Sequence, residues 1–310
     1  MMVKSSYFTL EAQPRIRNIT FDVTLSLKHF RTNAMSSFST AVNNINDSTM
    51  TRQSSQQKVG QIYGQFWLFY HDPSGFVCQT SENDQQFSTP YYILTWYYGT
   101  GGDFDLRYNT TANVLRLVEA VGDPDVQSYL FMAGNLASTT NNVNQFCGGI
   151  KWFDNVSITT TGTEPTAPSI AEDKYWSTWI VINSNQTNKF YAEVWLCAHA
   201  VSSCGSSSKW GRILNYNTGL TYYTGAGFEP EIGAFSNGDM WLVLGAVTNP
   251  YPFEIWTYST STQSWTNGVN STASFTFGGV HSGSALSVGS TLYLADPDNN
   301  NFIHVNADGS

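Results

Sequence analysis

Charged residues are scarce in this chain of 310 residues, because Asp, Glu, Lys and Arg together make up only 12% of it. That is about half of their ordinary share in globular domains. Lys and Arg number 14 against 23 Asp and Glu, which gives a formal net charge of −9. Since binding to a phosphate backbone needs clustered cations, we expect neither nucleic acid nor an anionic membrane surface as a partner.

Long apolar runs are also missing. No stretch approaches the roughly 18 consecutive apolar residues of a membrane-spanning helix, so no membrane span is predicted. The first residues, MMVKSSYFTLEAQ, lack the apolar core of a signal peptide. The composition is nevertheless typical of extracellular proteins, so an extracellular or cell-surface location is expected. N-x-S/T sequons such as that at Asn155 would be glycosylation sites there, although chance alone predicts about as many.

Only four cysteines are present, and none forms a CxxC pair. That spacing is the usual signature of structural zinc, so no metal site is expected, and no motif indicates a cofactor. Cys197 and Cys204 are seven residues apart across a predicted strand-to-turn segment. They are expected to form a local disulfide in an oxidising compartment. Cys78 and Cys147 are either a second pair or two buried thiols.

What the sequence does contain is a recurring apolar core. Copies are centred on Trp67, Trp179, Trp241 and Tyr293, with a weaker copy at Leu115. Runs this short, rich in aromatic and β-branched residues, are typical of strands buried on both faces. Another short strand precedes each core, and turn residues and a third strand follow it. In most copies an aromatic residue then ends the unit. Three strands joined by turns make each copy an antiparallel unit.

The spacing of the repeat predicts the fold. Successive cores are separated by 48, 64, 62 and 52 residues, the size of a three- or four-stranded propeller blade. One such unit cannot bury both faces alone, whereas neighbours packed around an axis can. The sequence therefore predicts an all-β fold, a β-propeller with five blades, six being the alternative. A β-sandwich is the rival architecture, but it does not explain the repetition.

This pattern divides the chain into two predicted regions. Residues 57–310 are predicted to form the propeller domain, and residues 1–56 an N-terminal closing strand and a polar linker. Within the second region, residues 15–27 alternate apolar and polar side chains for most of their length. We expect this segment to supply the outer strand of the last blade and so to close the ring.

The repeat resembles known propeller families. The segment GQFWLFYHDPSG at 64–75 and the segment at 258–268 resemble blades of sialidase-type propellers and of fungal fucose-binding lectins. The segment SCGSSSKW at 203–210 resembles a degenerate Asp box without its Asp and Gly. The resemblance is architectural and covers roughly residues 57–310. It implies a ligand site at the axial face, lined by loops and inner-strand ends.

The functional residues of those families are not evident in this chain. Sialidases need three convergent arginines, but Arg107, Arg116 and Arg212 lie at unequal phases of the repeat. Five-bladed glycosidases place an acidic base at the start of the first inner strand, and residues 54–59 contain no acid. A repeating Arg–Glu pair, as in fucose lectins, is not visible either.

Carboxylates near the predicted inner strands are the weak catalytic candidates. Glu231 is the sharpest, because its strand looks buried and burial raises a carboxyl pKa. Asp105 or Glu172 could serve as its partner, since glycoside hydrolysis uses two carboxylates a few ångströms apart. The competing interpretation is that all three are solvated loop carboxylates or charges that protect strand edges.

Aromatic residues are the second group of candidates. Core packing between blades is the stronger interpretation for Trp67, Trp179 and Trp241, whereas His71 is expected to be a surface residue in a turn. Flat aromatic rings also suit the C–H faces of sugars. Aromatic residues at blade ends, and one histidine near an inner strand, are therefore weak ligand-binding candidates: Trp152, Trp210, Trp265 and His281.

These observations favour an extracellular-type propeller that binds carbohydrate or a protein surface at its axial face without catalysis. The first alternative is a glycoside hydrolase or lyase that uses paired carboxylates on the same face. The second is a purely structural surface protein. The sequence leaves open whether the protein is an enzyme, because a fold alone does not determine function.

Overall fold

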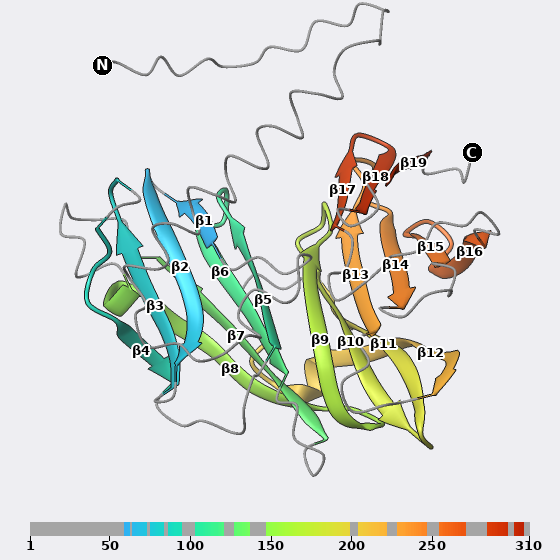
Figure 1. Cartoon of the computed structure of the whole chain (residues 1–310), viewed down its shortest axis with the longest axis horizontal. Coiled ribbons are helices and arrows are strands. Elements are labelled where there is room, and N and C mark those ends of the chain that lie inside the picture. Colours follow the sequence, from blue (N-terminus) through green and yellow to red (C-terminus); the bar gives the residue numbers. More distant parts are fainter. Residues whose placement is uncertain are drawn as a thin grey trace, which may run out of the picture. The chain divides into compact units, whose positions relative to one another are not determined.

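The structure is a computed structural model. It describes residues 59–62, 64–72, 75–83, 86–94, 103–120, 127–136, 147–198, 204–221, 228–246, 254–270, 284–296 and 301–306. These residues form β-strands and two single-turn 3-10 helices, η1 (Cys147–Gly149) and η2 (Ser207–Lys209) (Figure 1). The all-β prediction therefore holds for the described part of the chain.

The strands form five antiparallel sheets, named A to E here, in which the strand order follows the chain. Sheet A contains β1 (Val59–Ile62), β2 (Gln65–Asp72), β3 (Gly75–Ser81) and β4 (Tyr91–Leu94). Sheet B contains β5 (Asp103–Asn109), β6 (Val114–Ala120), β7 (Ser128–Asn135) and β8 (Lys151–Thr159). Sheet C contains β9 (Thr163–Glu172), β10 (Thr178–Gln186), β11 (Lys189–Cys197) and β12 (Trp210–Thr221).

The last two sheets follow the same plan. Sheet D contains β13 (Phe228–Ala234), β14 (Met240–Ala246), β15 (Glu254–Ser259) and β16 (Ser264–Asn270). Sheet E contains β17 (Ser284–Val288), β18 (Thr291–Asp296) and β19 (Asn301–Asn306). Among the described residues, sheet E thus has three strands where each of the other sheets has four. The predicted closing strand at residues 15–27 lies outside the described residues.

Tight turns join the strands where the backbone can adopt a positive φ. Between β17 and β18, Val288 pairs with Thr291, and Gly289 in the two-residue turn has a φ of 63°. Between β10 and β11, Thr187 and Asn188 both have positive φ values, of 51° and 61°. Two consecutive positive values are the mark of a type I′ hairpin turn, which matches the twist of antiparallel strands.

Each sheet packs its apolar side chains against those of the next sheet in the chain. Separate clusters lie between sheets A and B, B and C, C and D, and D and E. The tryptophans of the sequence repeat, Trp67, Trp179 and Trp241, are at most 2% exposed and belong to these clusters. Burying such large side chains is the main apolar contribution to the stability of the sheets.

The first strands of sheets B to E lie side by side. β9 contacts both β5 and β13, and β13 also contacts β17. In Figure 1, β5, β9 and β13 lie near the middle and β17 lies above β13. Neighbouring blades of a propeller have this arrangement. The ends of the first strands and the loops that follow them therefore form a shared surface, on which a site built by several sheets can form.

Candidate functional site

Side chains of the first strands join neighbouring sheets by accepting backbone hydrogen bonds. Asp105 of β5 is completely buried, and its Oδ2 accepts a 2.9 Å hydrogen bond from the Ile170 N–H of β9. Glu231 of β13 is also buried, and its Oε2 accepts a 2.9 Å hydrogen bond from the Ala285 N–H of β17. Asp105 therefore connects sheet B to sheet C, and Glu231 connects sheet D to sheet E.

A serine makes the equivalent contact in the sheet between them. The Ser169 Oγ of β9 accepts a 3.4 Å hydrogen bond from the Ile232 N–H of β13. Ile170 follows Ser169 directly, and Ile232 follows Glu231 directly. The three contacts therefore lie at equivalent positions of successive sheets. We call these three acceptors the clasp residues: Asp105, Ser169 and Glu231.

The third catalytic candidate, Glu172, lies at the end of β9 and forms an ion pair with Arg116 of β6. The Arg116 side chain is only 1% exposed. Asn109, the last residue of β5, donates a 2.9 Å hydrogen bond to the second oxygen of Glu172. Burial raises the pKa of Glu172, and the charge of Arg116 opposes that rise. Glu172 therefore joins sheet C to sheet B.

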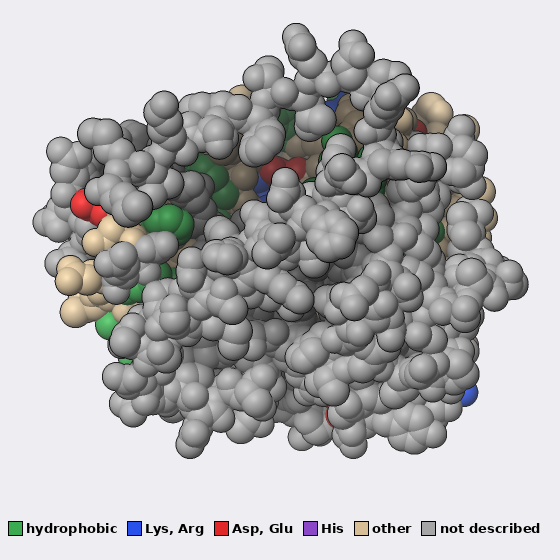
Figure 2. Space-filling model, turned by 45° about the horizontal axis from the view of Figure 1, so that its top comes forward, with side chains coloured by type: hydrophobic (Ala, Val, Ile, Leu, Met, Phe, Trp, Pro, Cys, Tyr) green, Lys and Arg blue, Asp and Glu red, His purple; other side chains and the backbone are tan. Residues whose placement is uncertain are grey.

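A second carboxylate interacts with Arg116 from its own sheet. Asp154 of β8 accepts hydrogen bonds from the backbone of Cys204 and Gly205, and its charge interacts favourably with Arg116. A Cβ at Gly205 would lie 2.5 Å from the Asp154 Oδ1, so only glycine lets the carboxylate come this close. On the face drawn in Figure 2, acidic side chains (red) likewise lie beside a basic one (blue).

The three catalytic candidates therefore bond in different directions. Asp105 bonds to sheet C, Glu172 to sheet B and Glu231 to sheet E. Each of the three carboxylates therefore makes a contact between two sheets.

His71 and Glu119 form a buried pair between sheets A and B. The expectation that His71 is a surface turn residue is wrong, because His71 lies in β2 and its side chain is 7% exposed. Its Nε2 lies 3.3 Å from the Glu119 Oε1 of β6, and its ring packs against Phe76 and Phe104. Burial raises the pKa of Glu119 to about 7. A protonated Glu119 can donate a hydrogen bond to the His71 Nε2.

This pair predicts a dependence of stability on pH. The native state keeps a proton on Glu119 up to about pH 7, whereas the unfolded chain releases it near 4.5. The free energy of unfolding is therefore expected to fall by about 3 kcal/mol as the pH rises through this range, and not to fall further above it. Glu119→Gln should remove most of this loss, as measured by urea unfolding at pH 4.5, 6 and 8.

The matched control for this prediction is Glu82→Gln, because Glu82 is an exposed carboxylate. It should keep the pH dependence of the native protein. An unchanged slope in Glu119→Gln would show that another group causes the effect.

The predicted ligand-binding residues lie in different surroundings. Trp210 is 6% exposed, and its Nε1 donates a 2.9 Å hydrogen bond to the Cys204 carbonyl, so its ring belongs to the core and not to an open surface. Trp152 and Trp265 are partly buried and pack at the edges of core clusters. His281 lies outside the described residues.

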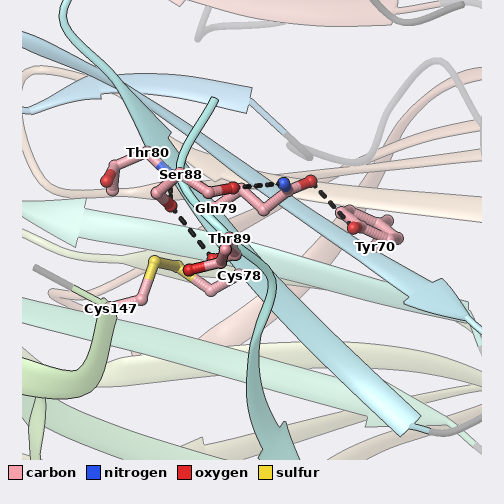
Figure 3. Close-up of a disulfide and its surroundings, with 7 residues drawn as sticks. All are labelled: Tyr70, Cys78, Gln79, Thr80, Ser88, Thr89 and Cys147. Carbon is pink, nitrogen blue, oxygen red and sulfur yellow. Dashed lines mark hydrogen bonds between the residues drawn. A yellow bond between two sulfur atoms is a disulfide. The ribbon is translucent and has the colours of Figure 1, made fainter. Parts of the chain in front are cut away.

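Two disulfides are present in the described residues. Cys197–Cys204, the pair expected from the sequence, connects β11 to the segment before β12. Cys78–Cys147, which the sequence left open, connects β3 of sheet A to η1, just before β8 of sheet B (Figure 3). One disulfide therefore acts within a sheet and the other between two sheets.

Hydrogen bonds order the chain around Cys78 (Figure 3). The Tyr70 hydroxyl donates a 2.8 Å hydrogen bond to the Gln79 Oε1, and the Gln79 Nε2 donates to the Ser88 carbonyl at 2.6 Å. The bonds tie β2, β3 and the segment before β4 together. The disulfide is therefore attached to an ordered part of sheet A.

The loop between β9 and β10 presents an aromatic side chain that the sequence analysis did not single out. The Asp173 Oδ1 accepts hydrogen bonds from the Tyr175 and Ser177 N–H groups at 2.8 and 2.9 Å, which closes the loop. Tyr175 is 48% exposed. Trp176 has a φ of 70°, in the left-handed region that a bulky residue rarely adopts. We call residues 173–177 the aromatic loop.

Lys174 attaches the aromatic loop to the neighbouring sheet. Its Nζ donates to the Asn237 carbonyl in the turn between β13 and β14. The same ammonium lies 5.0 Å from the centroid of the Tyr175 ring. A Cβ at Gly238 would lie 2.5 Å from the Lys174 Cδ, so the lysine stem rests directly on this glycine. Sheets C and D thus hold the loop together.

The turn between β13 and β14 is itself built from polar side chains. The exposed Asn237 donates a 2.7 Å hydrogen bond to the Asp239 Oδ2. The Asp239 Oδ1 accepts from the Thr260 N–H at 2.8 Å and from its hydroxyl at 3.0 Å. Amide, carboxylate and hydroxyl groups therefore lie next to the aromatic loop, in the turn that Lys174 contacts.

In the described part of the chain, no group of three or more His, Cys, Asp or Glu side chains could hold a metal ion. Within the same residues, no helix is long and apolar enough to cross a membrane.

Comparisons with known proteins give fold similarities only. No protein-family model matches the sequence, and no curated protein matches it either. Among solved structures, an exo-β-1,3-galactanase from Phanerochaete chrysosporium aligns with a TM-score of 0.43 and 15% identity over 80% of this chain and 59% of that chain. The phage phi92 endosialidase gives 0.48 and 11% over 81% and 51%. An endo-arabinase from Bacteroides thetaiotaomicron gives 0.44 and 10% over 84% and 92%.

The aligned part thus spans about three fifths of the galactanase and half of the endosialidase. At these scores and identities, the similarities do not indicate what this chain binds or whether it is an enzyme.

Proposed function

We propose that this chain is a five-bladed β-propeller that binds carbohydrate without changing it chemically, in an extracellular setting. The observation that carries the proposal is the structural use of the predicted catalytic carboxylates. Asp105 and Glu231 are buried and accept backbone hydrogen bonds from the next sheet, and Glu172 pairs with the buried Arg116.

Catalysis by these residues would conflict with their contacts. A glycosidase needs two carboxyl groups that both reach one glycosidic bond, roughly 5 to 10 Å apart. Turning Asp105 or Glu231 toward a substrate would leave the Ile170 or Ala285 N–H without its acceptor. An unsatisfied buried donor costs about 1 to 3 kcal/mol, so the contacts favour a structural role.

The remaining surface supports binding of a neutral, hydroxyl-rich ligand. Large aromatic side chains are at least 37% exposed at several positions: Tyr91, Tyr92, Phe153 and Tyr175. Such rings offer rigid apolar faces with little entropy to lose. The net charge of −9 disfavours acidic ligands. Two disulfides fit an oxidising, extracellular compartment.

The test is a glycan array, with isothermal titration calorimetry on the strongest binder and chromatography of that glycan after incubation. We expect binding with the glycan recovered intact. Glu231→Gln keeps an oxygen acceptor for the Ala285 N–H but removes the acid. It should retain both binding and stability, whereas Glu231→Ala should lower the free energy of unfolding by about 1 to 3 kcal/mol.

Two results would contradict the proposal. Cleavage of a glycan by the native protein, lost in Glu231→Gln, would make the protein a glycosidase. Absence of binding to every glycan would leave a protein-binding or purely structural propeller.

A further inference from the structure

We infer that the aromatic loop, together with the turn Asn237–Asp239, forms the carbohydrate subsite and takes a neutral pyranose against the Tyr175 ring. The inference rests on the proposed function and adds its location and ligand class. It places the subsite at the end of β9 where the chain enters β10, beside the adjoining turn of sheet D.

The Tyr175 side chain provides the contact surface. Nearly half of it is exposed, and the Lys174 ammonium lies over the ring, 5.0 Å from its centroid. A cation over an aromatic ring orients that ring and is itself stabilised by it. Tyrosine has few rotatable bonds, so little conformational entropy is lost when a sugar packs on the ring.

The loop is arranged for binding before any ligand arrives. Asp173 accepts three hydrogen bonds, from the Tyr175 and Ser177 N–H groups and from the Trp179 Nε1, which fixes both ends of the loop. Lys174 fixes its tip to the Asn237 carbonyl. Preorganisation of this kind improves affinity, because the loop does not have to be ordered on binding.

Trp176 gives a separate reason to assign function to this loop. Residues 174–176 connect Asp173 to Ser177. In a hairpin loop of this length, a last residue with a positive φ is usually glycine. This chain has tryptophan there, with a φ of 70° and a partly buried side chain. Strained conformations of bulky residues cluster at binding and catalytic sites. Thr187 and Gln263 also adopt positive φ values, of 51° and 54°, but Trp176 has a larger φ and a larger side chain than either.

The neighbouring polar groups determine the ligand class. Ser236 and Asn237 are exposed, and the partly buried Asp239 lies beside them. Hydroxyl and amide groups can exchange hydrogen bonds with sugar hydroxyls. Lys174, the cation of the loop, already bonds to the Asn237 carbonyl. The Asp239 carboxylate and the net charge of −9 would repel an acidic sugar. A neutral pyranose therefore fits this position better.

The experiment measures the affinity of four proteins for the strongest-binding neutral glycan of the array, by calorimetry. Tyr175→Ala is expected to weaken binding at least tenfold. Trp176→Gly is expected to weaken binding, and its Tm is measured alongside, because glycine relieves the strained φ but adds freedom to the unfolded chain. Leu286→Ala is the control, since Leu286 is an exposed apolar side chain, at 65%, on β17 of sheet E and is not one of the aromatic residues proposed to bind. It should bind like the native protein.

The outcomes separate the subsite from the proposed function. Loss of affinity in both loop variants, with native affinity in Leu286→Ala, supports the subsite. Native affinity in both loop variants overturns the subsite and leaves carbohydrate binding standing. A stronger response to acidic than to neutral glycans overturns the ligand class. No binding by the native protein overturns the proposed function and the subsite together.

Discussion

Arg116→Ala is expected to lower the free energy of unfolding by about 3 to 5 kcal/mol, the usual cost of removing one partner of a buried ion pair. Arg116 lies between Glu172 of sheet C and Asp154 of sheet B. Without the guanidinium, burial continues to raise the pKa of both carboxyls, and at Glu172 the smaller effect of the Arg107 charge is left to oppose that rise, together with the Asn109 hydrogen bond. The measurement is urea unfolding at neutral pH.

The matched control is Arg212→Ala. Arg212 pairs with the buried Glu193 at 3.8 Å, but its own side chain is 33% exposed. Glu193 keeps hydrogen bonds from the Thr161 and Gly162 N–H groups, so the loss should be smaller than for Arg116→Ala. Glu193 also keeps its hydrogen bond from the Ser184 hydroxyl. If the two variants lose equal stability, burial of Arg116 does not determine the effect. Arg116→Met combined with Glu172→Gln should recover much of the loss, because no charge then lacks its partner.

Removal of the disulfide between sheets A and B should cost more than removal of the one within sheet C. Cys78 and Cys147 are 69 residues apart, whereas Cys197 and Cys204 are separated by seven. A cross-link restricts the unfolded chain more when it closes a longer loop, which predicts about 4 kcal/mol for the first and about 2 kcal/mol for the second. All four cysteines are buried, so packing losses are comparable.

The measurement compares two double variants, Cys78→Ala with Cys147→Ala and Cys197→Ala with Cys204→Ala, by urea unfolding. The first should unfold at the lower urea concentration. The reverse order would mean that local contacts, and not loop length, determine the contribution of each disulfide.

The sequence predicted those features that depend on neighbouring residues. The strands around Trp67, Trp179 and Trp241 were found because each is a short, aromatic-rich run bounded by turn residues, and the structure buries all three. The Cys197–Cys204 pair was found because its cysteines are close in the chain. Local pattern therefore sufficed for the strands and for one disulfide.

Features that depend on the packing of different sheets were not predictable in this way. His71 follows an apolar strand and precedes a turn, which suggests exposure, but Glu119 and Phe104 of sheet B cover it. Burial of Glu231 was expected from its strand, but its hydrogen bond to Ala285, 54 residues later, was not. The aromatic loop was missed for a different reason, since the strained φ of Trp176 leaves no mark in the sequence.

The clasp residues also set an order for folding during synthesis. In each clasp, the acceptor side chain is made first and its backbone donor follows 65, 63 or 54 residues later. A ribosome adding about 5 to 20 residues per second therefore exposes each acceptor for several seconds before its partner exists. Sheets B, C and D each gain their clasp hydrogen bond only after the next sheet has emerged, so these sheets mature stepwise from the N-terminal side. A synthesis pause after a clasp residue prolongs the time for which its acceptor has no donor.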